Sequence, residues 1–376
     1  MKHVCHLSSV HPWNDVRVFH KECRSLASAD YRVTLIARGD EGSANVDGVD
    51  VLRVPPGPRW KRPMVWRQCA RHVMALRPDL LHFHDPELIP TACALGHRLR
   101  VPVIYDCHED NPAFIKIKYW LPRLVRLGAS MAFDRYERGR APAFAAVITA
   151  DDAVARRFDG TARTVVVFNY PIVPAGSRAS QPEDKACPRQ IIYVGVLSTA
   201  RGSLLMLEAM LHLLESVPDA HLRVVGGWDN EGDRRRAEEF LEAHRGLRDH
   251  VSFTGRVPHA TVLSEIARSA VGWAPLQDVE KYNKNIPTKL FEYMLHGLPV
   301  VASDLIPIRP YITQARCGLL ADPGDPLQHA TALKSLLEAP QAARETGQRG
   351  RQAVHQEYNW NNEAQKLLAL YARLLE

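Results

Sequence analysis

The sequence of 376 residues lacks paired cysteines: its seven cysteines are scattered, and none form a Cys-x-x-Cys motif. This spacing excludes a disulfide scaffold and argues against a zinc site, so we expect free thiols in a reducing compartment. Long apolar runs are also missing, because runs such as 165–168 and 298–302 are far shorter than the roughly 20 residues of a membrane-spanning helix. The first residues, MKHVCHLSSVHP, lack the apolar stretch of a secretory signal. We therefore expect a cytoplasmic protein.

The sequence shows no nucleic-acid-binding module, since it has neither an aromatic-basic RNA-binding motif nor a zinc finger. We therefore expect no nucleic-acid partner. The net charge of +6 is unevenly distributed: residues 1–180 hold 26 lysines and arginines against 18 acidic residues, whereas residues 181–376 hold 22 against 24. A basic first half indicates attraction to an anionic substrate or surface, and solubility alone is the alternative explanation.

Short β-branched runs alternate with longer amphipathic stretches along the chain. In the first half we expect strands at residues 2–7, 32–37, 49–54, 80–84, 103–106, 146–149 and 164–168, and helices at 18–28, 67–76, 89–99 and 123–138. In the second half we expect strands at 191–194, 221–225, 251–254, 271–274, 300–303 and 317–321, and helices at 203–216, 234–243, 260–269, 289–296, 326–339, 342–357 and 363–376. This alternation is typical of parallel α/β sheets.

The two halves are separated by residues 169–189, which are rich in proline, glycine, serine and charge and are predicted to be an interdomain linker. The fold class is therefore α/β, with two Rossmann-like, doubly wound parallel-sheet domains. Ligands of such sheets bind beyond the carboxyl ends of the strands. We accordingly expect the site in a central cleft that the two domains face.

Two segments of the second half, each at the end of a predicted strand, have features suited to binding phosphate. In YVGVLSTARG (193–202), a strand ends at Gly195, and Arg201 opens a helix whose free amides and guanidinium suit a diphosphate. A solvated surface arginine is the alternative. In VVGGWDNEGD (224–233), Gly226 and Gly227 permit close backbone approach to a ligand, although a tight turn explains them equally well. The spacing is not that of a dinucleotide fingerprint.

The segment NKNIPTKLFEYMLHGLPVVASD (283–304) is the most informative one. Pro287 fits the first turn of a helix, so Thr288 and Lys289 would present free amides there. Glu292 lies one turn further on an otherwise apolar helix, where its carboxylate can accept hydrogen bonds from two ribose hydroxyls. A glutamate on the exposed edge of an amphipathic helix is the alternative.

Taken together, these segments resemble the donor half of retaining glycosyltransferases of the GT4 type. The resemblance rests on YVGVLSTARG, VSFTGRVPHATV (251–262) and PTKLFEYMLHGLPVVASD (287–304). The first half is similar to bacterial surface-polysaccharide members through VHPWNDVRVFHKECRSLASADYRVTLIA (10–37), LHFHDPELIP (81–90) and VIYDCHED (103–110). The resemblance implies a GT-B fold, with an acceptor-side domain at 1–172, a donor domain at 173–356 and a C-terminal helix, 357–376, that packs back on the first domain.

The resemblance also implies roles for residues of the donor half. Glu292 would bind the ribose, and Arg201 occupies the position of a lysine that contacts the donor diphosphate. Thr288 and Lys289 stand at the helix start that holds the distal phosphate. The segment Gly255, Arg256 and Val257 would border the nucleotide base.

Two positions depart from the family pattern. Lys284 stands where the family has the first glutamate of its E-x7-E motif, which usually touches the transferred sugar. Val196 stands where an arginine often follows the first glycine, so one of two cationic phosphate contacts is missing. Lys284 is a candidate to supply charge to the donor instead.

In the first half, His108 follows a strand that ends near Asp106, where a doubly wound sheet presents functional groups. The resemblance makes it the histidine that orients the donor sugar, and a histidine there can also polarise a leaving group. Because His82 and His84 are two residues apart on a strand, both imidazoles are predicted to lie on one face.

The remaining acceptor-side candidates lie beside these strand ends. His84, Asp85 and Glu87 are expected to contact the substrate or the other domain, and metal binding is the alternative. GT-B enzymes generally need no metal for chemistry, so we expect none. In the loop after the first strand, further candidates are His11, Asp15 and Arg17. Arg17 could bind an acceptor phosphate and Asp15 an acceptor hydroxyl. The alternative is that Asp15 and Arg17 pair with each other to hold the loop.

Two basic stretches, 59–78 and 116–133, mix lysine and arginine with tryptophan, tyrosine, methionine and leucine. Such helices are typical of interfacial membrane binding, so the inner face of an anionic membrane is a candidate partner. Ordinary amphipathic helices whose cations extend to water are the alternative.

The sequence therefore predicts a retaining glycosyltransferase, of the hexosyltransferase type, that uses a nucleotide-diphosphate sugar and no cofactor. Its expected acceptor is a hydroxyl of a lipid-linked saccharide or of a surface-polysaccharide precursor. Three alternatives are a GT-B-fold sugar-nucleotide epimerase, a non-catalytic nucleotide-sugar-binding subunit of a polysaccharide assembly complex, and a transferase acting on a soluble small molecule.

Overall fold

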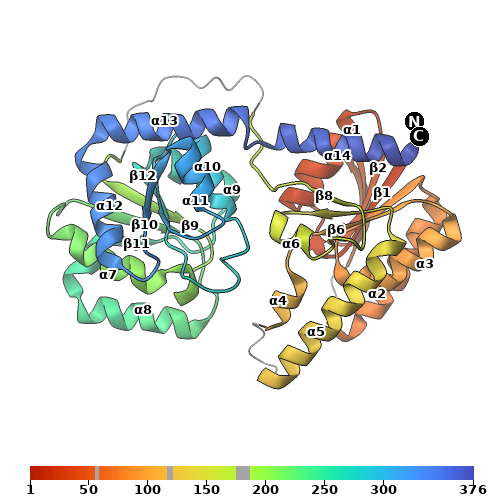
Figure 1. Ribbon diagram of the computed structural model, residues 1–376, viewed down its shortest axis with the longest axis horizontal. Coiled ribbons are helices and arrows are strands. Elements are labelled where there is room, and N and C mark those ends of the chain that lie inside the picture. The colour runs from red at the N-terminus through yellow and green to blue at the C-terminus, as the bar shows by residue number, and fades with distance from the viewer. Residues whose placement is uncertain (56–58, 117–121, 175–186) are drawn as a thin grey trace. The chain divides into compact units, whose positions relative to one another are not determined.

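The protein folds into two α/β units, which confirms the predicted fold class. The computed structural model describes residues 1–55, 59–116, 122–174 and 187–376 (Figure 1). Unit 1 consists of Met1–Ile172 together with Trp360–Glu376, and unit 2 consists of Val173–Asn359. The last helix of the chain therefore belongs to the unit in which the chain begins.

Within its described residues, unit 1 has a sheet of eight strands in the order β3-β4-β2-β1-β5-β6-β7-β8. The pairs are parallel, except that β3 runs antiparallel to β4. The strands are β1 (His3–Pro12), β2 (Arg32–Arg38), β3 (Gly42–Val46), β4 (Val49–Val54), β5 (Leu80–Phe83), β6 (Val103–Cys107), β7 (Ala146–Thr149) and β8 (Thr164–Val166). Because β1, β5 and β6 are parallel neighbours at the centre, the polar residues at their carboxyl ends lie at one edge of the sheet.

Helices cover both faces of this sheet. They are η1 (Val16–Cys23), α1 (Arg24–Ser28), α2 (Arg62–Leu76), α3 (Ile89–Leu99), α4 (Asn111–Lys116), α5 (Arg123–Arg140), α6 (Asp152–Arg156) and α14 (Trp360–Leu375), with short turns η2 (Arg59–Lys61), η3 (Pro86–Leu88) and η4 (Ala141–Ala143). Phe19, Leu26 and Leu367 place η1, α1 and α14 in one core cluster with β1 and β2. The alternate residues of the strands, such as Leu7, join α2 and α3 in a second cluster.

The helix predicted at 18–28 has two parts, of which the first, η1, is a π-helix. Its backbone bonds include one from the amide of His20 to the carbonyl oxygen of Asp15, five residues earlier. A π-helix brings residues at i and i+5 together, whereas an α-helix brings i and i+4 together. Arg17 and Glu22 therefore meet on the same side of η1.

The described residues of unit 2 form a parallel sheet of six strands in the order β11-β10-β9-β12-β13-β14. The strands are β9 (Gln190–Val194), β10 (His221–Val225), β11 (Val251–Phe253), β12 (Val271–Ala274), β13 (Val300–Ser303) and β14 (Gly318–Ala321). The helices are α7 (Ser203–Leu214), α8 (Glu231–Ala243), α9 (His259–Arg268), α10 (Thr288–Leu295), α11 (Arg309–Ala315), α12 (Pro326–Glu338) and α13 (Pro340–Gln356), with turns η5 (Thr199–Arg201) and η6 (Arg245–His250). Tyr193 and Trp273 lie in a core cluster with residues of α7, α8 and α12.

The sequence did not predict β3, α4, α6 or α11. Strand β3 is exposed over most of its length and contains Gly42 and Asn45, so it lacks the apolar alternation of a buried strand. The predicted linker is also partly wrong, because Asn169 and Tyr170 pack on unit 1. The Asn169 amide oxygen lies 2.6 Å from Lys21 Nζ, and Tyr170 is buried. Residues 175–186 of that predicted linker lie outside the described residues.

Candidate active site

Two glycine turns meet at the carboxyl ends of β9 and β10. Gly195 has a φ of +129° and donates its amide to the carbonyl oxygen of Val225 at 2.9 Å. Gly226 has a φ of +152°, and a Cβ atom there would lie 1.9 Å from the carbonyl oxygen of Gly195. Both backbone conformations and this close approach require glycine. The result is a backbone surface at the end of β9 without side chains of its own.

Two cationic side chains flank Gly195. Measured from the point that a Cβ atom on Gly195 would occupy, Lys289 Nζ lies at 3.4 Å and Arg201 Nη1 at 3.8 Å. Arg201 is half-buried and lies 5.9 Å from the centre of the Tyr282 ring. The turn η5 places it there, because Gly202, with a φ of +86°, follows it and packs against the carbonyl oxygen of Pro275. An anion that approaches Gly195 would meet the Arg201 guanidinium and the Lys289 amine.

Helix α10 carries the other predicted donor residues. It begins at Thr288, and Pro287 precedes it as the N-cap residue rather than standing inside its first turn. Thr288 is exposed at this start, where the first amides of a helix have no acceptor within the helix. Lys289 is buried, and Glu292 is half-buried one turn further on. The charge of Glu292 acts on Lys289, so the two side chains share one neighbourhood.

The residues predicted to edge the base lie beside this site. Gly226 forms an isolated bridge with Gly255, which joins the end of β10 to the loop after β11. Arg256 is exposed, and its Cγ atom lies 3.1 Å from the point that a Cβ atom on Gly227 would occupy. Val257 follows, half-buried. Arg256 and Val257 therefore lie on a surface next to the Gly195 turn.

Lys284 is engaged elsewhere. Its Nζ atom lies 3.0 Å from an oxygen of Glu280, one turn earlier in the same loop. Lys284 therefore has a carboxylate partner of its own, and the idea that it supplies free charge to the donor loses support. The described cations beside Gly195 are Arg201 and Lys289.

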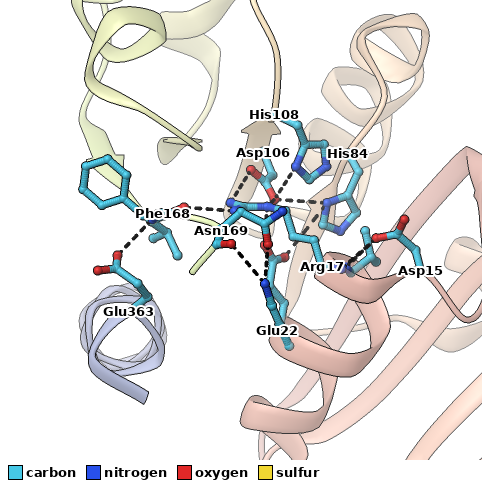
Figure 2. A network of polar contacts seen from close by, with 12 residues as sticks. Asp15, Arg17, Glu22, His84, Asp106, His108, Phe168, Asn169 and Glu363 are labelled. Carbon is cyan, nitrogen blue, oxygen red and sulfur yellow. Dashed lines mark hydrogen bonds and ion pairs between the residues drawn. The ribbon is translucent and has the colours of Figure 1, made fainter. Parts of the chain in front are cut away.

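Unit 1 contains a buried polar cluster at the carboxyl ends of β1, β5 and β6 (Figure 2). Arg17 donates from Nε and Nη2 to the two oxygens of Asp106 at 3.2 and 3.1 Å. It also donates from Nη1 to the carbonyl oxygen of Val167 at 2.9 Å. Both Arg17 and Asp106 are buried, so this is a desolvated, bidentate ion pair.

The place of Arg17 corrects two expectations. Its side chain is only 6% exposed, so it is not available to an acceptor phosphate. It does not form the predicted ion pair with Asp15 either. Asp15 instead caps η1 by accepting the amides of Arg17 and Val18 at 2.9 and 3.0 Å. The pKa of Asp15 is lowered, since its hydrogen bonds with His11 and the helix amides outweigh the effect of burial.

A chain of buried histidines continues from Asp106. His84 Nδ1 lies 3.2 Å from Asp106, and its Nε2 lies 3.0 Å from Nδ1 of His6. The Tyr371 hydroxyl, on α14, lies 3.0 Å from His6 Nε2 and 2.7 Å from His82 Nδ1. The rings of His82 and His84 stack at 4.6 Å, which confirms that they lie on one face of β5.

His108 lies at the outer end of this cluster. Its ring stacks on that of His84 at 5.3 Å, and its Nδ1 lies 3.5 Å from Asp106. Both ring nitrogens are buried and have no hydrogen-bond partner among the described residues. Burial lowers the pKa of His108 well below its usual range, in spite of the neighbouring Asp106. This shift favours the neutral imidazole, and neither ring nitrogen is satisfied by a hydrogen bond within the described residues.

The cluster holds two carboxyl groups, Asp106 and Glu22, but one guanidinium. Burial alone would raise the pKa of Asp106, but Arg17 holds it well below the usual range. The pKa of Glu22 is raised well above its usual range, because burial and the charge of Asp106 both disfavour its ionised form. Arg17 Nε lies 3.0 Å from Glu22 Oε1, but its N–H is directed to Asp106. These opposite shifts favour an ionised Asp106 and a protonated Glu22.

The other acceptor-side candidates make contacts at the carboxyl end of β1, which runs to Pro12 and so includes His11, predicted to lie in the following loop. Asp85 is buried and accepts from Ser8 Oγ at 2.8 Å and from the amide of Ser9 at 2.6 Å. Glu87 binds Arg62 at 2.6 Å and also accepts from Trp66. His11 lies 3.6 Å from Asp15 and 3.5 Å from Asp85. Burial would lower the pKa of His11, but these two carboxylates raise it.

Two groups in the described chain have the spacing of metal ligands: His6, Glu22, His82 and His84, and, separately, His84, Asp106 and His108. The guanidinium of Arg17 contacts both Glu22 and Asp106, so a cation would meet a fixed positive charge there. Both nitrogens of His6 already have hydrogen-bond partners. These contacts favour a hydrogen-bonded cluster over a metal centre.

The two doubly wound units, with a cation-flanked glycine turn in the second, define a GT-B glycosyltransferase fold. Residues 16–170 match the family described as a glycosyl transferase 4-like domain, and residues 188–339 match glycosyl transferases group 1. The chain belongs to these GT4-type glycosyltransferases.

The chain resembles a phosphatidyl-myo-inositol mannosyltransferase of Mycobacterium leprae, with 29% identity over 203 residues. That alignment covers 53% of this chain and 51% of the relative, so the chain spans about half of its length. Among solved structures, sucrose-phosphate synthase from Thermosynechococcus elongatus matches with a TM-score of 0.71, 19% identity and coverage of 100% and 99% of the two chains. HepE of Anabaena in complex with UDP-glucose matches with a TM-score of 0.70, 15% identity and coverage of 99% and 100%.

Sequence reasoning missed four members of the buried cluster: His6, Glu22, Asp106 and Tyr371. A signal for His6 existed, because it is a polar residue between the apolar residues Cys5 and Leu7 of the first strand, and it pairs in register with His82. Tyr371 carried no such signal, since it lies 365 positions from His6 and reaches it only through the packing of α14.

Proposed function

We propose that this protein transfers a sugar from a nucleoside-diphosphate sugar to an acceptor hydroxyl with retention of the anomeric configuration. The observation that carries the proposal is the convergence of Arg201 and Lys289 on Gly195, beside the start of α10 and Glu292. Cations and free helix amides stabilise a diphosphate, and a carboxylate one turn away suits the vicinal hydroxyls of a ribose.

In the proposed reaction, an oxygen of the acceptor attacks the anomeric carbon of the donor sugar. The bond from that carbon to the diphosphate oxygen breaks, and the departing phosphate takes the acceptor proton on the same face of the sugar. Arg201, Lys289 and the first amides of α10 would stabilise the charge that develops on the diphosphate. His108, whose lowered pKa favours the neutral form and whose ring nitrogens have no hydrogen-bond partner among the described residues, would bind a hydroxyl of the sugar. No metal is required in this scheme.

The proposal is tested by a thermal-shift screen against UDP, GDP, ADP, CDP and TDP. A nucleotide that binds the folded state raises its stability by about 2.7 kcal/mol at a hundredfold excess over Kd. We expect one or two bases to raise the melting temperature by several degrees. A screen in which none of the five does so would contradict a donor site in unit 2.

An assay with the nucleotide sugar whose base the screen selects then distinguishes a transferase from an epimerase and from a non-catalytic subunit. A transferase releases nucleoside diphosphate faster when an acceptor saccharide is added. An epimerase would form a new nucleotide sugar from the donor alone, and a non-catalytic subunit would bind the donor without turnover.

We further propose that the acceptor is lipid-linked and that α5 contacts an anionic membrane. No helix in the described parts of the chain has the length and apolar character to span a bilayer. On α5, however, Leu124, Leu127 and Met131 are 84%, 51% and 68% exposed and recur at the spacing of one helix face, with Arg123 alongside. Such a face suits the headgroup boundary of a bilayer. Residues 117–121 of the predicted basic stretch lie outside the described residues.

Vesicle sedimentation tests this contact. At low salt we expect the protein to pellet with vesicles that contain phosphatidylserine, and the double variant Leu124→Asp/Leu127→Asp to stay in the supernatant. The matched control is Leu327→Asp, which changes a leucine that is 58% exposed on α12 of unit 2 and should leave pelleting unchanged. Equal pelleting of the double variant and the wild type would exclude α5 as the contact.

A further inference from the structure

We propose that the side-chain amine of Lys289 is the second cation of the diphosphate site, and that it takes up a proton when the donor binds. The inference rests on the proposed function, since it concerns the same site in unit 2. It assigns to the amine, and not to the helix amide of Lys289 alone, the contact with the diphosphate. It also makes donor binding dependent on proton uptake by one named group.

The geometry around Lys289 carries the inference. The residue is 7% exposed, and its Nζ has no hydrogen-bond partner among the described residues. The amine lies 3.6 Å from the centre of the Tyr193 ring and 3.4 Å from the point that a Cβ atom on Gly195 would occupy. A buried amine without an acceptor is costly, so its position beside the Gly195 turn needs an explanation. A diphosphate oxygen seated over Gly195 would supply the missing acceptor.

The two other positions considered for a second cation beside Gly195 do not supply it. Val196, next to Gly195, carries no charge, and Lys284 binds Glu280 at 3.0 Å. Lys289 reaches the same turn from α10, so it restores the pair of cations that a doubly charged diphosphate favours.

The charged state of Lys289 follows from its neighbours. Burial is the main cause that lowers its pKa well below the usual range, and the positive charge of Arg201 lowers it further. Glu292 acts in the opposite direction but does not outweigh these effects. The phenols of Tyr193 and Tyr293 have raised pKa values through burial and remain neutral. A bound diphosphate brings negative charge beside the amine and therefore favours its protonated form.

Calorimetry in two buffers tests the proposal on the full chain. UDP-glucose, or GDP-mannose if the screen selects guanosine, is titrated in PIPES and in Tris at one pH, because their different enthalpies of protonation reveal the protons taken up. A nucleotide sugar has no phosphate proton to exchange near neutral pH. We expect uptake that rises with pH towards one proton per donor bound.

Variants at this position separate charge from proton exchange. Lys289→Met should abolish the uptake and weaken binding at least tenfold, while the melting temperature without ligand stays equal or rises, because an unpaired buried amine is removed. Lys289→Arg should bind without uptake, since arginine stays charged. Lys334→Met, which changes a side chain that is 42% exposed on α12, is the control and should match the wild type in both readouts.

The outcomes distinguish this inference from the proposed function. Donor binding without proton uptake by the wild type, or undiminished uptake by Lys289→Met, would overturn the role of Lys289 and leave the donor site intact. Absence of binding by the wild type to any of the nucleotides would overturn both.

Discussion

Replacing Arg201 with alanine should weaken the binding of the nucleotide donor at least 100-fold. Arg201 supplies a planar fork that can donate to two diphosphate oxygens, and hydrogen bonds to charged groups contribute about 1.5–3 kcal/mol each. The side chain is half-buried and lies against the Tyr282 ring rather than in an ion pair of the fold, so the folded state should not depend on it. Calorimetry with the nucleotide selected by the screen measures the loss.

A matched control and a companion variant sharpen this test. Arg235→Ala removes an arginine that is 75% exposed on α8 of the same unit and should leave donor affinity unchanged. Glu292→Gln keeps the shape of the side chain but removes the charged acceptor for the ribose, and we expect roughly a tenfold or greater loss of affinity. Unchanged affinity in both Arg201→Ala and Glu292→Gln would show that the nucleotide binds elsewhere.

Asp106→Asn should destabilise unit 1 by about 3–5 kcal/mol, because it leaves the buried guanidinium of Arg17 without its charged partner. Arg17→Met should cost a similar amount by leaving Asp106 unpaired. Urea denaturation followed by tryptophan fluorescence measures both. The effect is large because both groups are buried and joined by two hydrogen bonds.

Glu22→Gln is the matched control, since it makes the same change of carboxylate to amide in the same cluster. Because the raised pKa of Glu22 favours its protonated form in the folded state, we expect the stability of Glu22→Gln at pH 7 to equal or exceed that of the wild type. A loss comparable to that of Asp106→Asn would show that Glu22, and not Asp106, carries the negative charge.

The two carboxyl groups also have opposite dependence on pH. The lowered pKa of Asp106 stabilises the fold above the unfolded value of about 3.9, and this stability is lost as the pH falls through the folded value. The raised pKa of Glu22 acts in reverse, since stability falls as the pH rises above the unfolded value of about 4.3 towards the folded one. Glu22→Gln should therefore show a flatter decline of stability above about pH 5.

Most helices and strands could be predicted because the pattern that indicates each of them lies within a few neighbouring residues. The strands at 49–54, 146–149, 221–225, 271–274 and 300–303 have the predicted bounds. Helix α10 shows how local such signals are, since Pro287 marks its start to within one residue. Elements with weak apolar patterns, such as β3 and α11, escaped prediction for the same reason.

The sequence by itself determined that this chain forms two parallel α/β units. It also determined that segments resembling GT4-type glycosyltransferases follow the strands of the second unit. Both could be predicted because alternating periodicity and glycine turns depend only on residues close together in the chain. Only the tertiary structure decided which polar side chains are paired within the fold and which are left without a partner. Arg17 is drawn inward by Asp106, 89 positions away, and Lys289 is left without an acceptor beside Gly195. Ion pairing and desolvation depend on distances between segments far apart in the chain, and packing alone sets those distances.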